Sequence, residues 1–342
     1  MNERVVYWNG KMIPERDAKV SIYDSALMFG DTVFDMTRSF NKEQFKLREH
    51  LERLYYSAKC VRMPLEMSMH EMEEHIYEVV DANDPLFEKD DEHRIMINVT
   101  RGLLSIYEDV VGVEKGINVI IADFPLRWTV SSMARLFDTG VNAVVPSQRA
   151  IPAHLLDPKI KNRSRIHYLM ANIEVSQVAG NNNWALLLDP DGFVAEGTGD
   201  NFFFVKDGVL VTPEGRNILR GISRNYILDE LAPQLGIPCV TKNFGLFDVV
   251  NADEAFYTGT PFCIMPCTSI NGIHIGDGIT KMFPCRSGEI THELIMQWGE
   301  NVGVPIVEQI QKWAKNSNSS APSPYQFKEN TLPSQNWRRS DL

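Results

Sequence analysis

Short apolar runs joined by tight-turn residues recur along most of this chain, and they constrain its fold more than any other feature. Residues 5–8 are followed by Asn9-Gly10, a dipeptide typical of two-residue hairpin turns, and then by a second apolar run. Residues 202–205 and 209–211 flank Lys206-Asp207-Gly208 in the same way. Strands that return through hairpins pair antiparallel, whereas a doubly wound sheet needs long crossovers. The pattern therefore predicts a mixed, barrel-like core.

The length of the chain predicts more than one core. A chain of 342 residues suggests two domains at roughly 100–200 residues each, and the mixture of helices and hairpins indicates an α+β fold. We expect a small α/β domain over 1–132, with helices at 48–60 and 68–81, and a larger domain over 133–316. Residues 317–342 are rich in Ser, Asn and Pro and are predicted to be disordered. Helices of the larger domain are expected at 166–178, 223–235 and 287–299.

Charge and cysteine content narrow the classes of protein. The net charge is −11, from 45 acidic against 34 basic residues, which argues against nucleic-acid binding. The polar N-terminus does not resemble a signal peptide, and no apolar run approaches the ~20 residues of a membrane helix. Five scattered cysteines without a CxxC pair argue against a zinc site or a disulfide framework. We therefore expect a cytoplasmic protein that binds neither metal, membrane nor nucleic acid.

Several common catalytic motifs are absent. The chain has no GxxxxGK[ST], HExxH or GxSxG segment. Gly197-Thr198-Gly199 lacks the third glycine of a dinucleotide fingerprint, and the histidines of 70–75 have the wrong spacing for a zinc helix. These absences weaken the nucleotide-binding, metalloprotease and serine-hydrolase interpretations.

Three polar segments instead carry the chemistry. Residues 157–163 (DPKIKNR) form a basic strip before an expected helix. Residues 193–202 (FVAEGTGDNF) set a carboxylate among small residues between apolar runs. Residues 219–224 (LRGISR) place a glycine before a helix start, whose free N–H groups suit a phosphate. Each segment alone is also consistent with an ordinary surface edge, hairpin or helix start.

Together with further segments, they resemble the fold-type IV aminotransferases. This family includes branched-chain aminotransferase, D-amino-acid aminotransferase, (R)-amine transaminase and aminodeoxychorismate lyase. The matching segments occur in the family's order: 29–35 (FGDTVFD), 49–54 (EHLERL), 157–161 with 171–174 (DPKIK and ANIE), 196–203 (EGTGDNFF), 221–224 (GISR) and 259–266 (GTPFCIMP). The resemblance implies the two-domain fold of D-amino-acid aminotransferase and the cofactor pyridoxal 5'-phosphate.

The resemblance also assigns residues to that cofactor. Lys161 is expected to form a Schiff base with its aldehyde and then to move a proton between the substrate α-carbon and the cofactor carbon. A lysine, whose usual pKa is ~10.4, needs burial or neighbouring positive charge to act near neutrality, and Arg163 and Arg165 are candidates for that charge. Glu196 is expected to keep the pyridine nitrogen protonated. The phosphate is expected to bind to Arg53, Gly221, Ile222, Ser223 and Thr260.

Arg163 is the alternative to Lys161 at the lysine position. Counting back from Glu196 without a gap places Arg163 where some relatives have lysine. We prefer Lys161 because the segments 157–161 and 171–174 then both align without gaps. The two extra residues fall in the loop 180–183, where an insertion costs little. With the gap elsewhere, the chain would have no catalytic lysine.

Four residues are candidates for substrate binding. Phe34 and Arg38 lie in a segment similar to the branched-chain pattern, although Phe34 fits core packing equally well. Arg101 is a further candidate for the polar network of the site. Pro261 replaces the alanine usual in the family and has no N–H to donate to a substrate carboxylate. Arg165 and Ile166 stand where relatives often have a tyrosine.

The default expectation is a transaminase that exchanges an amino group between branched-chain L-amino acids and 2-oxoglutarate. The alternatives are a transaminase of D-amino acids or (R)-amines, a lyase of the aminodeoxychorismate type that needs no 2-oxo acid, and a non-catalytic relative. The resemblance also implies a homodimer, in which the partner chain closes an active site between the two domains.

Overall fold

The N-terminal part of the protein folds as an antiparallel sheet. The structure is a computed structural model that describes residues 3–110, 112–180, 182–276 and 288–315. The sheet has five strands in the order β2-β1-β7-β6-β3. The expected first hairpin is confirmed, because Trp8 pairs with Lys11 across Asn9-Gly10, and both turn residues have positive φ. The strands are β1 (Val5–Trp8), β2 (Lys11–Pro14), β3 (Thr32–Met36), β6 (His93–Thr100) and β7 (Asn118–Pro125).

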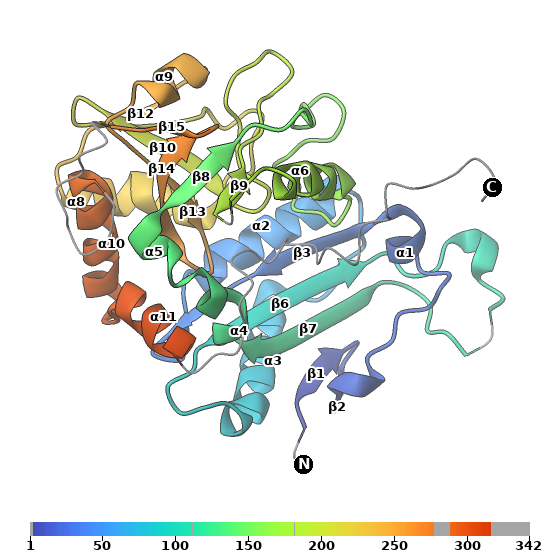
Figure 1. Ribbon diagram of the computed structural model, residues 1–342. Helices are drawn as coiled ribbons and strands as arrows, with labels where there is room; N and C mark the ends of the chain where they lie inside the picture. The colour runs from blue at the N-terminus through green and yellow to red at the C-terminus, as the bar shows by residue number, and fades with distance from the viewer. Residues whose placement is uncertain (1–2, 111, 181, 277–287, 316–342) are drawn as a thin grey trace, which may run out of the picture.

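Two helices pack on this sheet because each has one apolar face. In α2 (Leu47–Cys60), Leu51 and Leu54 are fully buried. In α3 (Met69–Asn83), Met72 and Ile76 are fully buried, and the helix begins at a capping box made by Ser68 and Glu71. Figure 1 shows both helices beside the blue-to-green sheet, with α2 on the side of the C-terminal part. The helices expected at 48–60 and 68–81 are thus present with small shifts at their ends. Shorter elements of this part are η1 (Glu15–Asp17), β4 (Ser39–Phe40), β5 (Glu43–Gln44), η2 (Asp84–Leu86) and η3 (Ser105–Tyr107).

The second part is built on an eight-stranded mixed sheet. Its order is β12-β11-β10-β13-β14-β8-β9, and β15 pairs with β14. The hairpin expected around Lys206-Asp207-Gly208 is confirmed as β10 paired with β11. Three strand pairs are parallel, namely β11 with β12, β14 with β8, and β8 with β9. The strands are β8 (Val141–Val144), β9 (Asn183–Ala185), β10 (Asn201–Lys206), β11 (Val209–Thr212), β12 (Cys239–Thr241), β13 (Glu254–Gly259), β14 (Cys263–Ile270) and β15 (Ile273–His274).

The edges of this sheet are connected by an irregular segment. After β9, the amide of Leu187 donates to the carbonyl of Glu196, and the amide of Ala195 donates back to Leu187. On the other side of this segment, the amide of Val194 donates to the carbonyl of Phe244, just beyond β12. The sheet is therefore closed by backbone hydrogen bonds, as the expected barrel-like core requires. The closing segment also carries Glu196.

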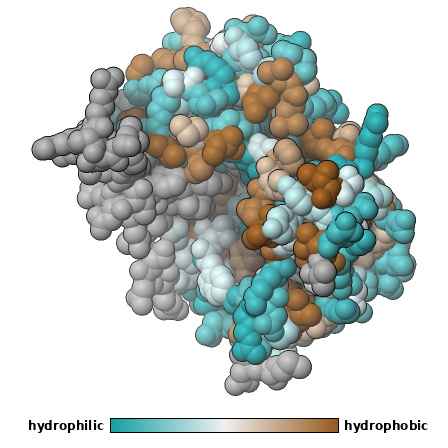
Figure 2. Space-filling view, turned by 90° about the vertical axis from the view of Figure 1, so that its right-hand side faces the viewer, coloured by the Kyte–Doolittle hydropathy of each residue, from teal (hydrophilic) through white to brown (hydrophobic). Residues whose placement is uncertain are grey.

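One face of the molecule exposes a patch of large apolar side chains. α1 (Ser25–Phe29) and the start of α6 (Ile166–Ser176) are held together, because the hydroxyl of Ser164 donates to the carbonyls of Phe29 and Gly30. We define the α1–α6 patch by its exposed side chains, which are Ile22, Leu27, Phe29, Ile166 and Met170. Figure 2 views the side on which α1 lies and shows apolar residues among polar ones there. In the described ranges, no helix has the length and apolar character to cross a bilayer.

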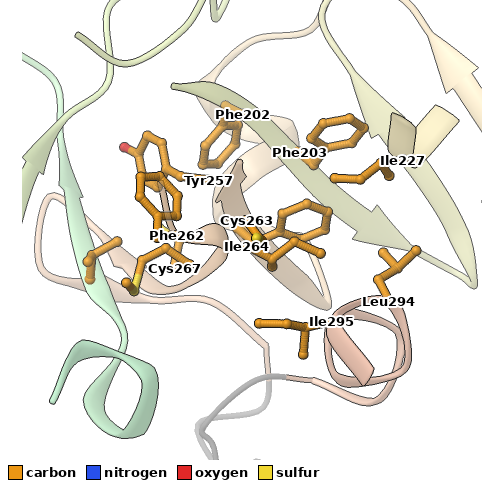
Figure 3. Packing of buried hydrophobic residues seen from close by; sticks show 14 of the residues in the cluster. Phe202, Phe203, Ile227, Tyr257, Phe262, Cys263, Ile264, Cys267, Leu294 and Ile295 are labelled. Atoms are coloured by element: carbon orange, nitrogen blue, oxygen red, sulfur yellow. The ribbon is translucent and has the colours of Figure 1, made fainter. Parts of the chain in front are cut away.

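The larger core lies between the second sheet and the C-terminal helices. Side chains of β10, β13 and β14 pack against Ile227 of η5 and against Leu294 and Ile295 of α10 (Figure 3). Each of the three is almost fully buried. The surrounding helices are α7 (Ile222–Tyr226), which continues through the π-helix η5 (Ile227–Leu231) into α8 (Ala232–Gln234), α9 (Leu246–Val250), α10 (Glu289–Val302) and α11 (Ile306–Lys315).

The boundary between the two parts is crossed by packing contacts. A helical run of α4 (Arg127–Val130), η4 (Ser131–Met133) and α5 (Leu136–Thr139) joins them. Each sheet has its own apolar cluster, but Phe40, Leu126 and Val130 belong to the cluster of the second sheet. The division at residue 132 stays a prediction, and the tail at 317–342 lies outside the described residues.

Candidate active site

A cavity between the two parts brings the expected cofactor-binding residues together. Its empty space, including the part open to solvent, is about 850 Å³. Arg53 comes from α2 of the first part, and the other residues come from the second part. The members of the expected cofactor set on its wall are Arg53, Lys161, Glu196, Gly221, Ile222, Ser223 and Thr260. Phe34, expected at the substrate, lines the same cavity.

The backbone of Lys161 is attached to the edge of the first sheet. Its amide donates to the hydroxyl of Ser57 at 3.1 Å, and its carbonyl accepts from the amide of Phe34 at 3.0 Å. The ammonium nitrogen lies 4.9 Å from the centroid of the Phe34 ring. Burial, followed by the positive charges of Arg53 and Arg165, lowers the pKa of Lys161 to about 7. A large fraction of this amine is therefore neutral near pH 7 and able to accept a proton.

Arg163 lies outside the cavity that Lys161 lines. Its guanidinium donates twice to the side-chain oxygen of Asn98, at 3.1 and 3.0 Å, and stacks 3.6 Å from the centroid of the Phe34 ring. It is not among the residues that line the cavity. This geometry favours Lys161 over the alternative alignment.

Glu196 is a buried carboxyl group held by three donors. Oε1 accepts from the hydroxyl of Tyr168 at 2.9 Å, and Oε2 accepts from the side chain of Asn201 and the amide of Leu219, both at 3.0 Å. Burial is the largest effect on its acidity and, against these donors, raises the pKa of Glu196 to about 7. A bound cation would favour the ionised form of such a group. Glu196 therefore suits a protonated ring nitrogen in the cavity.

Two glycines allow the backbone to lie close to the side chains around the Glu196 carboxyl group. A Cβ atom on Gly197 would lie 1.9 Å from Oδ1 of Asp200, and a Cβ atom on Gly221 would lie 2.1 Å from Oδ1 of Asn201. Asn201 also donates to the carbonyl of Leu219 at 2.9 Å, so it joins Glu196 to the segment before α7. These contacts explain why glycine is needed at both positions, and they fix the position of the α7 start on the cavity wall.

Tyr168 is a site residue that the sequence did not identify. The family tyrosine just after the lysine is missing, and Arg165 and Ile166 occupy those places. Tyr168 follows Arg165 by three residues, about one helical turn, and lines the cavity with its hydroxyl on Glu196. The only signal for it in the sequence is a tyrosine about one helical turn after the position where relatives often have one.

Replacing Tyr168 by phenylalanine is expected to lower kcat by about 10-fold, since a hydrogen bond to a charged group is lost. With one donor fewer, the pKa of Glu196 rises further, so the acid limb of the activity profile moves to higher pH. The measurement is kcat as a function of pH. Tyr55→Phe is the matched control, because it removes a hydroxyl that donates to the carbonyl of Met67 on the far side of α2 from the cavity lining. An unmoved acid limb in Tyr168→Phe would count against this role.

A buried ion pair orients Arg53, and no pattern in the sequence indicated it. Nε and Nη2 of Arg53 donate to the two oxygens of Asp35 at 2.8 Å each, and His50 lies 2.7 Å from the same carboxylate. Burial alone would raise the pKa of Asp35, but Arg53 and His50 hold it well below its usual range. Nη1 of Arg53 reaches the carbonyl of Arg220, immediately before the α7 start. Asp35 thus positions the guanidinium beside the helix start.

Replacing Asp35 by asparagine is expected to lower the free energy of unfolding by about 3–5 kcal/mol, because the largely buried guanidinium of Arg53 loses its partner. The affinity for pyridoxal 5'-phosphate is expected to fall as well, since Arg53 loses its two acceptors. Urea unfolding of the apoprotein and fluorescence titration with the cofactor measure the two effects. Asp31→Asn is the control, because Asp31 pairs with the half-buried Arg101 at 2.6 Å, outside the cavity. Equal effects of the two substitutions would refute the role of Asp35.

The phosphate end of the expected site consists of a cation and a helix start. Gly221 is the N-cap of α7 and makes no side-chain cap. Ile222 and Ser223, whose amides are the first of the helix, both line the cavity. Arg53 adds a positive charge, and Thr260 adds a hydroxyl. Free amides and a guanidinium are the groups that bind phosphate. With Lys161 and Glu196, the residues present fit pyridoxal 5'-phosphate.

The expected substrate residues divide into two groups. Phe34 and Pro261 line a second chamber that shares Lys161, Arg165 and Thr260 with the cofactor cavity. Arg38 and Arg101 line neither chamber, contrary to expectation. Arg38 is buried behind the 260–262 turn, where it donates to the carbonyl of Pro261 at 3.1 Å and lies 3.8 Å from the centroid of the Phe40 ring. Arg101 is held by Asp31 and by the carbonyls that follow α2. Arg38 therefore supports the turn behind the second chamber, and Arg101 has its partners outside both chambers.

Comparison with known proteins agrees with this arrangement. A family model described as amino-transferase class IV matches residues 32–270. The putative branched-chain-amino-acid aminotransferase of Methanocaldococcus jannaschii is 35% identical over 87% of this chain and 98% of its own length. The branched-chain-amino-acid aminotransferase of Escherichia coli (strain K12) is 32% identical over 86% of this chain and 95% of its own length.

Solved structures agree as well. A T.th. branched-chain amino acid aminotransferase, complexed with N-(5'-phosphopyridoxyl)-L-glutamate, superimposes with a TM-score of 0.74 at 29% identity, over 88% of this chain and 94% of that one. The sequence expectations of a two-domain fold-type IV architecture, of pyridoxal 5'-phosphate and of transamination are therefore confirmed. The chain belongs to the class IV aminotransferases, the enzymes that exchange amino groups between amino acids and 2-oxo acids with pyridoxal 5'-phosphate as cofactor.

Proposed function

We propose that Lys161 holds the cofactor and transfers the proton in this aminotransferase. When bound, pyridoxal 5'-phosphate supplies an aldehyde carbon that takes up the amino group and a ring that draws electrons from the reacting carbon. The Nζ atom of Lys161, with its pKa lowered to about 7, accepts the proton from the substrate carbon and returns it during the exchange. The observation that carries this proposal is that one cavity contains this amine, a buried Glu196 and Arg53 beside a helix start.

The remaining residues of the expected cofactor set would hold the cofactor and polarise its ring. Glu196 keeps a proton at the ring nitrogen, because its ionised carboxylate is stabilised by that positive charge. Tyr168 and Asn201 keep the carboxylate in place. Arg53, the amides of Ile222 and Ser223, and the hydroxyl of Thr260 bind the phosphate. Asp35 fixes Arg53 from behind and so holds the guanidinium beside the α7 start.

We also propose that the amino donors are branched-chain L-amino acids, with 2-oxoglutarate as acceptor. Two observations support this choice: the names of the relatives, and the apolar wall of the second chamber, which includes Met36, Met133, Trp184 and Phe262. Pro261 departs from the family pattern because it has no N–H to donate to a substrate carboxylate, and D-amino acids and (R)-amines are the competing donors.

A donor panel tests the substrate proposal. L-amino acids, D-amino acids and amines are each supplied with 2-oxoglutarate and with pyruvate, and product formation is followed. Turnover of L-leucine, L-isoleucine and L-valine at least about 10-fold faster than of the other donors supports the proposal, since a missing methylene already changes rates by about 10-fold or more. A preference for D-amino acids or amines would overturn the choice of donor. A reaction independent of any 2-oxo acid would identify a lyase.

We further propose that the protein is a homodimer formed through the α1–α6 patch. Leu27, Phe29 and Ile166 are 66–69% exposed, which is unusual for a cluster of large apolar side chains. The patch adjoins the cavity, because Ser164 and Arg165 lie at its edge and line the cavity. A second copy placed there would therefore cover the opening of the site. The four cysteines of the described residues are free, which supports the cytoplasmic location that we also propose.

Light scattering tests the oligomeric state. The wild type is expected to have twice the mass of the chain, and Leu27→Asp with Phe29→Asp is expected to give a monomer. Phe247→Asp is the control, because this side chain on α9 is 81% exposed and lies away from the patch. A monomeric wild type would exclude the dimer, and an undisturbed double variant would place the interface elsewhere.

A further inference from the structure

The second chamber contains more charge than an apolar amino-acid side chain needs. Besides its apolar wall, it is lined by Arg94, Lys161, Arg165 and Asp200. Lys161 is the reacting amine. Every amino-acid or 2-oxo-acid substrate carries a carboxylate next to the reacting carbon, and a carboxylate binds best to charged donors. One of the remaining groups is therefore expected to receive this carboxylate.

Two of the possible donors can be set aside. Residue 261 is proline, so the turn at 260–262 has no amide donor there. Arg94 lines the second chamber but not the cofactor cavity, and its Nη2 atom lies 3.9 Å from the sulfur of Met36 on β3. A carboxylate on the reacting carbon has to lie where both chambers meet, beside Lys161.

Arg165 lies at this junction. Like Lys161, it lines both chambers, and both cations lie over the ring of Phe34, at 5.7 Å for Arg165 and 4.9 Å for Lys161. Its guanidinium also lies 4.9 Å from the centroid of the Tyr168 ring, and one of its Nη2 hydrogens is donated to the carbonyl of Thr198. A guanidinium has five N–H donors in a rigid plane, so the group keeps donors for a ligand while its orientation is fixed.

The surroundings of Asp200 favour its neutral form. Oδ1 of Asp200 is buried and has no hydrogen-bond partner within the described ranges. Burial and the neighbouring Glu196 raise the pKa of Asp200 well above its usual range. A protonated carboxyl group neither repels a carboxylate nor neutralises Arg165, and it has an O–H to donate.

We propose that Arg165 binds the α-carboxylate of the amino-acid and 2-oxo-acid substrates and thereby selects them over simple amines. This inference rests on the proposed function of the same site. In this chain, the guanidinium of Arg165, three residues before Tyr168, supplies the donors that the missing tyrosine and the missing amide of residue 261 would otherwise provide. Substrates without a carboxylate next to the amino group would gain nothing from it.

Equilibrium binding of an unreactive ligand pair tests the proposal apart from catalysis. Isothermal titration compares 4-methylvaleric acid with its primary amide on the cofactor-loaded wild type and on Arg165→Met. The acid is expected to bind the variant about 100-fold more weakly, because one partner of a charge pair is removed, whereas the amide is expected to bind both proteins equally. Arg165→Lys is expected to recover part of the affinity for the acid, since it restores the charge without the planar donors.

Arg163→Gln is the matched control, because it removes an equal charge from the same Phe34 ring but from outside both chambers. It is expected to leave the ratio of acid to amide affinity unchanged. Kinetics add a second readout, in which Arg165→Met raises KM for L-leucine far more than it lowers kcat. The proposal is overturned if the acid and the amide lose affinity equally, if neither does, or if Arg163→Gln reproduces the effect. If the wild type bound the acid through Arg165 but transaminated no substrate, the proposed function would be wrong, whereas the role of Arg165 would stand.

Discussion

Replacing Lys161 by alanine is expected to lower the rate of transamination by at least about 10⁴-fold, the largest effect of any single substitution in this protein. The amine at this position both attaches the cofactor and carries the proton, so both contributions disappear together. The measurement is the single-turnover rate of the variant reconstituted with an excess of pyridoxal 5'-phosphate. A small residual rate is expected, because Glu196 and the phosphate-binding groups remain in place.

Lys159→Ala provides the matched control for this prediction. Lys159 lies two residues earlier on the same segment and forms an ion pair with Asp157 at 2.8 Å, away from the cavity wall. Its loss is expected to leave the rate within about 3-fold of the wild type, as for a surface ion pair. A Lys161→Ala protein that retained more than about a hundredth of the activity would show that another group transfers the proton.

Replacing Glu196 by glutamine is expected to lower kcat by about 10²–10³-fold, the range found when one preorganised electrostatic group is removed from an active site. The amide fits the same contacts, because its oxygen accepts from Asn201 and Leu219 while its nitrogen donates to the hydroxyl of Tyr168. The substitution therefore removes the charge and leaves the geometry intact. A neutral amide does not hold a proton on the ring nitrogen.

Steady-state kinetics and a melting curve measure the effect of Glu196→Gln. The melting temperature is expected to stay close to that of the wild type, which separates catalysis from folding. Glu214→Gln is the control for a loss of one negative charge, because Glu214 is partly exposed, lies outside the cavity wall and pairs with Arg216 at 3.1 Å. If Glu196→Gln kept more than about a tenth of the wild-type kcat, another group would have to protonate the ring nitrogen.

The local elements of the fold were accessible from the sequence because their signals are local. Asn9-Gly10 predicted the β1–β2 hairpin, and the apolar spacing in 48–60 predicted α2. The closure of the second sheet was not accessible in this way. It depends on the backbone hydrogen bond of Val194 to Phe244 in a distant segment, which leaves no periodic pattern in the sequence. The π-helix η5 inside the helix expected at 223–235 also left no signal.

The residues of the site divide in the same way, into those that the sequence predicted and those that it did not. Lys161, Glu196 and the α7 start could be predicted because each lies in a short segment that resembles the family. Asp35 lies in such a segment too, but its role, like that of Tyr168, depends on which side chains the fold places next to Arg53 and Glu196. Arg38 was expected in the pocket from its neighbours in the sequence, but its partner is the carbonyl of Pro261, 223 residues away in the chain.

Borohydride reduction of the cofactor-loaded protein, followed by peptide mapping, tests the central claim most directly. We expect the reduced cofactor on the side-chain nitrogen of Lys161 in the wild type and in Lys159→Ala, and on no residue of Lys161→Ala. An active protein that carried the label on Lys159, or on no lysine between residues 157 and 165, would contradict the account.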